Sequence, residues 1–376
     1  MSQNLRFPEF TGEWEKKKMK DVCTFYSGGT PTSSNKDYYS GDIPFIRSGE
    51  LHERSTELFI SEDGLNNSSA KMVYKGDLLL ALYGATSGDI AISQIEGAIN
   101  QAILCINTQH SKEYIKAIWQ KHVQKILQTY LQGGQGNLSA DIVKNISFYF
   151  ASSKEQGKLA NFIRLLDERI TTQNKIIDKL QSLIKGIVNR TILSKEKNAI
   201  VGDVCSISEQ IRAEANIDDI ITVRLHGNGV CKSSAENLQL GATQYYRRRA
   251  GQLIYGKQNF HNGAIGIVPI SLDNGITSKD IPSFDIDEMK CNSVYLLAQL
   301  QSPQYYKPAE ALTTGTGSKR LKEETFLKMP IILPNKREQD NIAVLIHRAS
   351  MNLDHAKRLL ELLSIQKQYL LRQMFI

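Results

Sequence analysis

The sequence predicts the α+β fold class, with two tandem-duplicated mixed α/β domains separated by a long antiparallel two-helix coiled coil. Three observations predict it. Similar segments recur about 183 residues apart in a chain of 376 residues. Each copy starts with short apolar runs between loops rich in glycine, asparagine and serine, a pattern typical of strands and turns. Each copy ends with apolar residues spaced three and four apart, which is typical of a long helix.

The duplication is carried by three pairs of matching segments. They are KMKDVCTF (18–25) with IVGDVCSI (200–207), GDLLLALYGATSGDIAI (76–92) with GQLIYGKQNFHNGAIGI (251–267), and the stretches 136–163 and 318–346. The offset falls from 182 in the first pair (200 − 18) to 175 in the second (251 − 76), so the second copy lacks about seven residues near its start. It returns to 183 where Leu138 aligns with Leu321. A period this long excludes a solenoid and indicates duplication of a whole domain with its connector.

Each copy is predicted to contain a compact domain followed by a helix. The compact domains are expected at 1–150 and 198–333, and the helices at 151–197 and 334–376. Within the first domain, SKEYIKAIWQKHVQKILQTYLQ (111–132) has the spacing of an amphipathic helix, and NSVYLLAQLQSPQYYKPA (292–309) is its weaker partner. The chain is long enough to bury one core in each copy.

The two long helices carry matching signals. Residues 152–155 (Ser-x-x-Glu) and 335–338 (Asn-x-x-Glu) have the spacing of a capping box. Behind each cap, apolar residues follow one heptad seam, interrupted once by Gln173 and once by Lys367. The seam residues include Ile163, Leu166, Ile170, Ile177, Leu180, Ile184 and Ile187 in the first helix, and Leu353, Leu360, Leu363 and Leu370 in the second. A single amphipathic helix on a globular core is the alternative, but two matching seams favour mutual pairing.

Composition and motifs exclude several classes of protein. The chain has a net charge of +7, five cysteines without a Cys-x-x-Cys pair, and no run of about 18 apolar residues. The polar N-terminus lacks the apolar core of a secretory signal, so we expect a protein of the reducing cytoplasm and no membrane partner. The sequence has no P-loop, nucleophile elbow or His-Glu-x-x-His helix. We therefore expect no catalytic residue, no metal and no cofactor.

Glycine-rich loops at corresponding places of both copies carry amide, basic, hydroxyl and aromatic side chains. Glutamine and asparagine can pair with adenine and arginine or lysine with guanine, while backbone amides and hydroxyls suit phosphate oxygens. The loop residues that we expect to bind DNA are Tyr83, Thr86, Gln135, Asn137, Lys257, Gln258, Asn259, Lys319 and Arg320 in corresponding loops, and Arg247 and Arg248 in QYYRRRAG (244–251), which has no equally basic counterpart. For any single residue, an ordinary polar loop is the alternative. The correspondence between two copies favours a function for the loops as a set.

Several stretches, taken together, carry a family resemblance along the whole chain. They include LRFPEF, GGTPTS, GDIPFIRSGEL, KGDLLLALYGATSGDIAI, AINQAI, EQGKLANFIRLLDERI and EQDNIAVLIHRASMNLD. In these stretches the chain resembles the specificity subunit of type I restriction-modification systems. Two of these stretches contain further candidate DNA-binding residues: Thr30 lies in GGTPTS and Arg47 lies in GDIPFIRSGEL. The second copy departs from the family pattern in YGKQNFHNGAIG and lacks a GGTP run, which fits a domain that reads a different sequence.

The resemblance implies the following function. The compact domains would be target-recognition domains, each reading one half of a bipartite asymmetric target in double-stranded DNA, with the paired helices as a spacer. Two modification (methyltransferase) subunits would dock on this scaffold, and restriction (translocase/nuclease) subunits would complete a cleaving assembly. The specificity subunit itself would be non-catalytic.

A stand-alone nuclease or methyltransferase with an integral DNA-reading half is the alternative function. It requires a carboxylate cluster or a cofactor loop, and the sequence shows neither. A coiled-coil adaptor that binds no nucleic acid is a second alternative, and the paired loops argue against it. The half-target sequences, the gap between them, the presence of a restriction subunit and the division of loop residues between bases and phosphates stay open.

Overall fold

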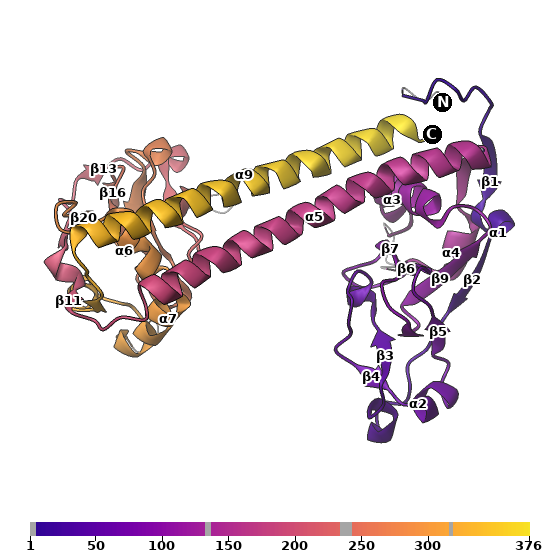
Figure 1. Ribbon diagram of the computed structural model, residues 1–376, viewed down its shortest axis with the longest axis horizontal. Coiled ribbons are helices and arrows are strands. Elements are labelled where there is room, and N and C mark those ends of the chain that lie inside the picture. Colours follow the sequence, from indigo (N-terminus) through magenta and orange to yellow (C-terminus); the bar gives the residue numbers. More distant parts are fainter. Residues whose placement is uncertain (1–4, 132–136, 234–242, 316–318) are drawn as a thin grey trace. The chain divides into compact units, whose positions relative to one another are not determined.

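The computed structural model describes residues 5–131, 137–233, 243–315 and 319–376. The chain folds as two compact units (Figure 1). Unit 1 comprises Met1–Asn174 and Leu359–Ile376, and unit 2 comprises Lys175–Arg358. Each unit therefore contains one mixed α/β domain and a part of both long helices, α5 (Ser153–Thr191) and α9 (Lys336–Met374). The helices were predicted within 151–197 and 334–376, and each begins two residues after the start of its segment. Helix α5 ends six residues before the end of its predicted segment.

Unit 1 is built from two four-stranded sheets and a two-stranded ribbon. The first sheet has the order β2 (Cys23–Ser27), β9 (Ile103–Thr108), β6 (Leu78–Ala81) and β7 (Ile90–Ile92). The second has the order β4 (Phe59–Ile60), β3 (Ile43–Ile46), β8 (Gly97–Ile99) and β5 (Lys71–Val73), and the ribbon pairs β1 (Glu15–Lys18) with β10 (Ser147–Phe150). The helices are α1 (Met19–Val22), α2 (Glu62–Asn66), α3 (Lys112–Leu131), α4 (Ala140–Asn145) and the start of α5.

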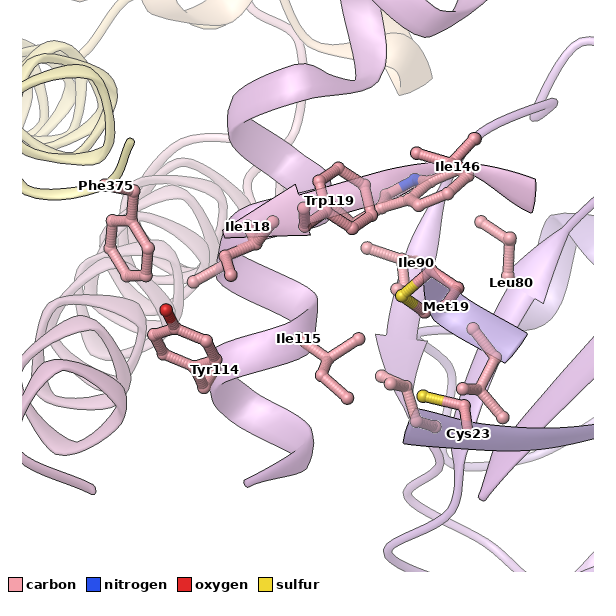
Figure 2. Close-up of a cluster of buried hydrophobic side chains, with 14 of the residues drawn as sticks. Met19, Cys23, Leu80, Ile90, Tyr114, Ile115, Ile118, Trp119, Ile146 and Phe375 are labelled. Carbon is pink, nitrogen blue, oxygen red and sulfur yellow. The ribbon is translucent and has the colours of Figure 1, made fainter. Parts of the chain in front are cut away.

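The main core of unit 1 lies between α3 and the first sheet (Figure 2). Side chains alternate along β6: Leu78 and Leu80 belong to this core, while Leu79 and Ala81 belong to a second buried cluster on the other face. The predicted amphipathic helix is confirmed as α3, whose Trp119 is fully buried and donates its indole N–H to the Gly88 carbonyl (2.8 Å).

Unit 2 repeats this plan with shorter elements. Its four-stranded sheet has the order β12 (Cys205–Ile207), β20 (Ser283–Ile286), β17 (Leu253–Tyr255) and β18 (Ile265–Ile267). Unit 2 also has a three-stranded sheet with the order β13 (Arg212–Ala213), β16 (Tyr245–Arg247) and β19 (Ile276–Ser278). Two further strand pairs are β14 (Ile221–Val223) with β15 (Val230–Lys232) and β11 (Ala199–Ile200) with β21 (Pro330–Ile331). The predicted helix at 292–309 is divided into α6 (Ser293–Leu300) and α7 (Pro303–Tyr306), where proline takes the first helical position; α8 (Glu323–Leu327) follows.

The register of the strands confirms the duplication residue by residue. Leu78 pairs with Ile92 in unit 1, and Leu253 pairs with Ile267 in unit 2, which keeps the offset of 175 on both strands. Ribbon β1–β10 places Lys18 opposite Ser147, and β11–β21 places Ile200 opposite Pro330. The two units therefore share these strand pairings.

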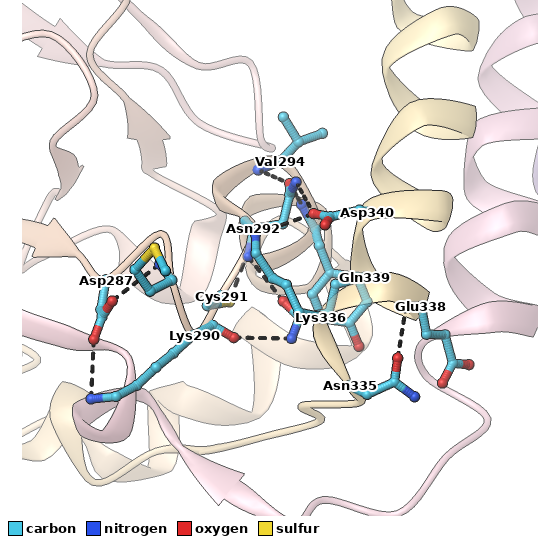
Figure 3. A network of polar contacts seen from close by, with 12 residues as sticks. Asp287, Lys290, Cys291, Asn292, Val294, Asn335, Lys336, Glu338, Gln339 and Asp340 are labelled. Carbon is cyan, nitrogen blue, oxygen red and sulfur yellow. Dashed lines mark hydrogen bonds and ion pairs between the residues drawn. The ribbon is translucent and has the colours of Figure 1, made fainter.

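A buried glutamine near the start of each long helix joins that helix to its own domain. In unit 2, Gln339 accepts from the Asn292 amide and donates to the Pro334 and Lys290 carbonyls (Figure 3). In unit 1, Gln156 donates to the Ala151 carbonyl, the position equivalent to Pro334, and bonds to His110. Because a buried amide must satisfy its hydrogen-bonding groups, each glutamine fixes how its helix leaves the domain.

The long helices contact each other in antiparallel fashion within each unit. In unit 1, the start of α5 shares a buried cluster with the end of α9, through Ile163 and Leu371 among others. In unit 2, the end of α5 shares a cluster with the start of α9, through Val188 and Ile342. The predicted antiparallel helix pair is therefore confirmed. All eleven predicted seam residues are buried or half-buried: Ile163, Leu166, Ile170, Ile177, Leu180, Ile184, Ile187, Leu353, Leu360, Leu363 and Leu370.

The interruption of the seam at Lys367 has a partner. Lys367 Nζ lies 2.6 Å from one oxygen of Asp167 on α5, and Lys116 Nζ of α3 lies 2.8 Å from the other. Burial would raise the pKa of the Asp167 carboxyl, but the two lysines and their hydrogen bonds outweigh it and hold the pKa below its ordinary value. One carboxylate therefore links both long helices to the α/β domain of unit 1.

This carboxylate predicts a pH dependence of stability. A folded-state pKa below the unfolded value, about 3.9 for aspartate, stabilises the protein above that value, and the contribution is lost as the pH falls through the folded pKa. We expect Asp167→Asn to lower the free energy of unfolding near pH 7 and the difference from the parent to shrink below about pH 4. Urea unfolding at stepped pH measures it, with Asp178→Asn, exposed on the same helix, as control. A difference independent of pH would contradict the prediction.

No helix in the described part of the chain is long and apolar enough to cross a membrane.

Candidate nucleic-acid interface

The same two backbone hydrogen bonds join three loops in each unit. In unit 1, the Leu82 amide donates to the Ala102 carbonyl and the Leu138 amide donates to the Leu82 carbonyl, both at 2.8 Å. In unit 2, Lys257 N donates to Asp280 O and Leu321 N donates to Lys257 O, both at 2.9 Å. We call each arrangement a loop junction. Most of the candidate DNA-binding residues lie on the loops that these junctions join.

The junction of unit 1 presents hydroxyl and amide groups. Tyr83 donates its hydroxyl to the Gln101 carbonyl, and Thr30 donates its hydroxyl to the Gln101 side chain (2.6 Å). Gly28 precedes Thr30 and packs so closely on β8 that an added Cβ would lie 1.8 Å from the Ile99 carbonyl oxygen. Only glycine therefore lets this loop pack against the sheet, where Thr30 reaches the Gln101 side chain.

The remaining candidates of unit 1 have different surroundings. Thr86 is half-buried and Asn137 is exposed, while Gln135 lies outside the described residues. Arg47 donates to Glu50 and Glu57, and these hydrogen bonds raise the pKa of its guanidinium. Two carboxylates therefore hold the guanidinium of Arg47.

Gln101 is a candidate that the sequence interpretation missed. Its side chain is exposed, and both its carbonyl and its side chain meet candidate residues. It stands in AINQAI, one of the stretches that carry the family resemblance, and this was the available signal.

The junction of unit 2 is more highly charged. Lys257 is nearly buried and its Nζ lies 2.7 Å from Glu323, while Arg320 lies 3.2 Å from Asp280. Gln258 and Asn259 are exposed beside Lys257. Lys319 is 61% exposed, with Glu310 3.6 Å away. Gln258, Asn259 and Lys319 are therefore the candidates with the greatest access to a ligand, whereas Lys257 and Arg320 are held by carboxylates.

The three consecutive arginines after Tyr246 divide between solvent and core. Arg247 and Arg249 are exposed, but Arg248 is fully buried. Its Nε donates to Thr277 Oγ1 (2.7 Å), Nη1 to Ser283 Oγ (3.0 Å) and Nη2 to the Ile281 carbonyl (2.9 Å). The prediction that Arg248 contacts DNA is wrong, because its guanidinium is enclosed and already hydrogen-bonded by the protein.

The described residues do not provide the donor set that a metal site requires. Among the described residues, no group of three or more histidine, cysteine, aspartate or glutamate side chains could hold a metal ion. The side chains that the loops do offer are hydroxyls, amides and cations, which suit hydrogen bonding to base edges and phosphates.

The fold and loops define a duplicated α/β protein: two similar units, each with its own loop junction and with parts of two long helices. Comparison with known proteins shows what the chain is similar to. Residues 11–182 match the family model described as "Type I restriction modification DNA specificity domain". Residues 11–182 are therefore similar to the DNA specificity domain of type I restriction-modification systems.

Individual relatives agree with this family. The MjaIX specificity subunit of Methanocaldococcus jannaschii is 27% identical over 184 residues, which are 45% of this chain and 42% of that relative. The chain thus matches less than half the length of that subunit. The MjaVIII specificity subunit of the same organism is 19% identical over 90% of this chain and 86% of its own length.

A solved structure agrees with the fold. The S subunit of a type I restriction-modification system from M. genitalium covers 100% of this chain and 99% of its own, with a TM-score of 0.67 and 12% sequence identity. At this identity, the similarity concerns the fold.

Proposed function

We propose that this chain recognises a bipartite, asymmetric DNA target, with each unit reading one half. The observation that carries the proposal is the loop junction, built twice from the same backbone hydrogen bonds but with different side chains. Unit 1 offers mainly hydroxyls and amides, whereas unit 2 adds lysine and arginine beside exposed amides. A shared framework with unlike contact groups suits two unlike half-targets.

The long helices serve as the spacer and as the docking surface in this proposal. The α5–α9 pair leaves a groove of about 560 Å³ in unit 1, lined by Phe162, Leu165, Leu166, Leu359 and Leu363 among others. Leu165 is 46% and Leu359 is 44% exposed, and Leu362 and Ile365 extend the apolar surface. An exposed apolar patch on a helix pair is typical of a protein–protein interface. We assign it to the two modification subunits; restriction subunits complete the assembly.

Chemistry belongs to the docked subunits in this proposal. The chain supplies sequence recognition and geometry, and its partners supply methyl transfer and cleavage. Methyl transfer from S-adenosylmethionine, or DNA cleavage, by the purified chain alone would instead favour a stand-alone enzyme with an integral DNA-reading half.

Removal of single exposed cations tests DNA binding. We expect Arg247→Ala and Lys319→Ala to weaken binding. A lost phosphate contact lowers the slope of log affinity against log salt by about one for all sequences, whereas a lost base contact relaxes one target position at about 1–3 kcal/mol. Fluorescence anisotropy on duplexes selected from a random pool measures both effects.

Lys185→Ala, which removes an exposed lysine from α5 rather than from a loop, is the matched control. Unchanged binding in both loop variants would show that these loops do not face DNA. Failure of the selection to enrich any sequence would contradict the proposed function as a whole.

A further inference from the structure

One buried position distinguishes the cores of the two units. In unit 1, Val73, Ile99 and Cys105 belong to one buried apolar cluster. The strand registers place Arg248, Thr277 and Ser283 at the equivalent positions of unit 2. Val73 pairs with Gly97 across β5 and β8, and the Arg248 amide donates to Gly275 in the corresponding pair. Three apolar side chains of one copy are thus replaced together by an arginine and two hydroxyls.

The three polar residues of unit 2 are in contact with one another. Arg248 donates to both new hydroxyls, and the Thr277 hydroxyl in turn donates to the Ile281 carbonyl (2.9 Å), which also accepts from Arg248. Gln210 lies at the limit of hydrogen bonding, 3.5 Å from Nη1. The guanidinium therefore links β16, β19, β20 and the turn at 278–281 at a single point.

Stability alone does not explain this arrangement. Burial lowers the pKa of Arg248 to about 10, so the group remains charged at neutral pH. Within the described parts of the chain, no carboxylate forms an ion pair with it. An isolated buried charge is costly to desolvate, and apolar packing of similar volume stabilises a core at least as well. Unit 1 has such apolar packing at this position. Compared with it, the arginine of unit 2 adds hydrogen bonds of fixed direction, because its planar guanidinium determines where its partners lie.

The turn that Arg248 holds is also the centre of the loop junction. Asp280 is adjacent to Ile281, and its carbonyl accepts from the Lys257 amide (2.9 Å). Its carboxylate lies 3.2 Å from Arg320, and the Lys257 carbonyl accepts from the Leu321 amide. A continuous path of direct contacts therefore leads from Arg248 to three loops that carry candidate DNA-binding residues. Arg247, the residue before Arg248 and the last residue of β16, is exposed.

We propose that Arg248 is a positioning residue for the second recognition unit: from inside the core it holds the 278–281 turn, and with it the loop junction and Arg247, in the orientation that reads the second half-target. This inference rests on the proposed function for its effect on DNA, but its structural part does not. Unit 1 does the same with apolar packing, so its discrimination is independent of Arg248.

Transplanting the apolar core of unit 1 into unit 2 tests the proposal. The triple variant Arg248→Val, Thr277→Ile, Ser283→Cys replaces the polar set with the apolar set of unit 1, and the half-buried Ile281 carbonyl loses its two side-chain donors. We expect it to keep the unfolding midpoint of the parent and full discrimination at the first half-target. Discrimination against single-base changes in the second half-target should fall by about tenfold or more. Equal discrimination by parent and variant at the second half would overturn the proposal.

Amide hydrogen exchange provides a second measurement that needs no DNA. Thr277→Val is nearly isosteric and removes the acceptor of Arg248 Nε. We expect the Lys257 and Leu321 amides to exchange about tenfold faster in this variant. The equivalent Leu82 and Leu138 amides of unit 1 are an internal control and should not change. Unchanged exchange at Lys257 and Leu321 would overturn the positioning role. If the parent shows no sequence preference, the proposed function fails, and the exchange result still decides whether Arg248 holds the loops.

Discussion

A Leu363→Asp variant is expected to lose more than about 3 kcal/mol of unfolding free energy. Leu363 is 5% exposed and lines the α5–α9 groove of unit 1 together with Leu166. The substitution removes a buried apolar side chain from the helix interface and places an unpaired carboxylate there. Denaturant unfolding followed by circular dichroism measures the loss, and we expect a lower midpoint with an unchanged helical signal before unfolding.

The adjacent residue offers a matched control. Leu362 is 62% exposed, so Leu362→Asp introduces the same charge one residue away without burying it. We expect its stability to stay within about 0.5 kcal/mol of the parent. Similar losses for both variants would show that Leu363 is not at a helix–helix interface. If Leu362→Asp remains stable but no longer binds modification subunits, that result supports the docking surface proposed above.

Removal of one heptad from each long helix is expected to abolish binding to the natural target. Deleting 176–182 from α5 and 352–358 from α9 removes segments that lie opposite each other in the antiparallel register set by Asp167 and Lys367. The heptad repeat keeps the remaining seam in phase. Seven residues are about 10 Å of helix, which corresponds to roughly three base pairs of DNA. Three pairs also turn one half-site by about a third of a helical turn.

Selection from a random duplex pool measures the outcome. We expect the shortened protein either to select a gap about three base pairs shorter, with both half-sequences unchanged, or to select nothing because the half-sites no longer face it. A deletion from α5 alone is the control and should destroy the helix pairing. Half-sequences that change with helix length, or a continuous target, would contradict the role of the helices as a spacer.

Local patterns in the sequence determined the duplication and the helix pair. The offsets of 182, 175 and 183 reappear in the strand registers, and the heptad seams reappear as two buried helix faces. These features were predictable because both are patterns in the sequence itself: the periodicity of apolar residues within one helix, and the spacing between repeated segments. Pro303 is also a local signal, because proline marks the start of a new helix and so divides the helix expected at 292–309. The prediction from apolar periodicity alone did not take it into account.

Tertiary structure alone decided which polar residues are available to a ligand. Three consecutive arginines look alike in the sequence, yet Arg248 is enclosed while Arg247 is exposed, because successive side chains near a strand point to opposite faces. Lys367 looks like a defect in the seam, and only the folded chain brings Asp167 and Lys116 to it. Burial and ion pairing depend on which distant segments pack together, and no local pattern contains that information.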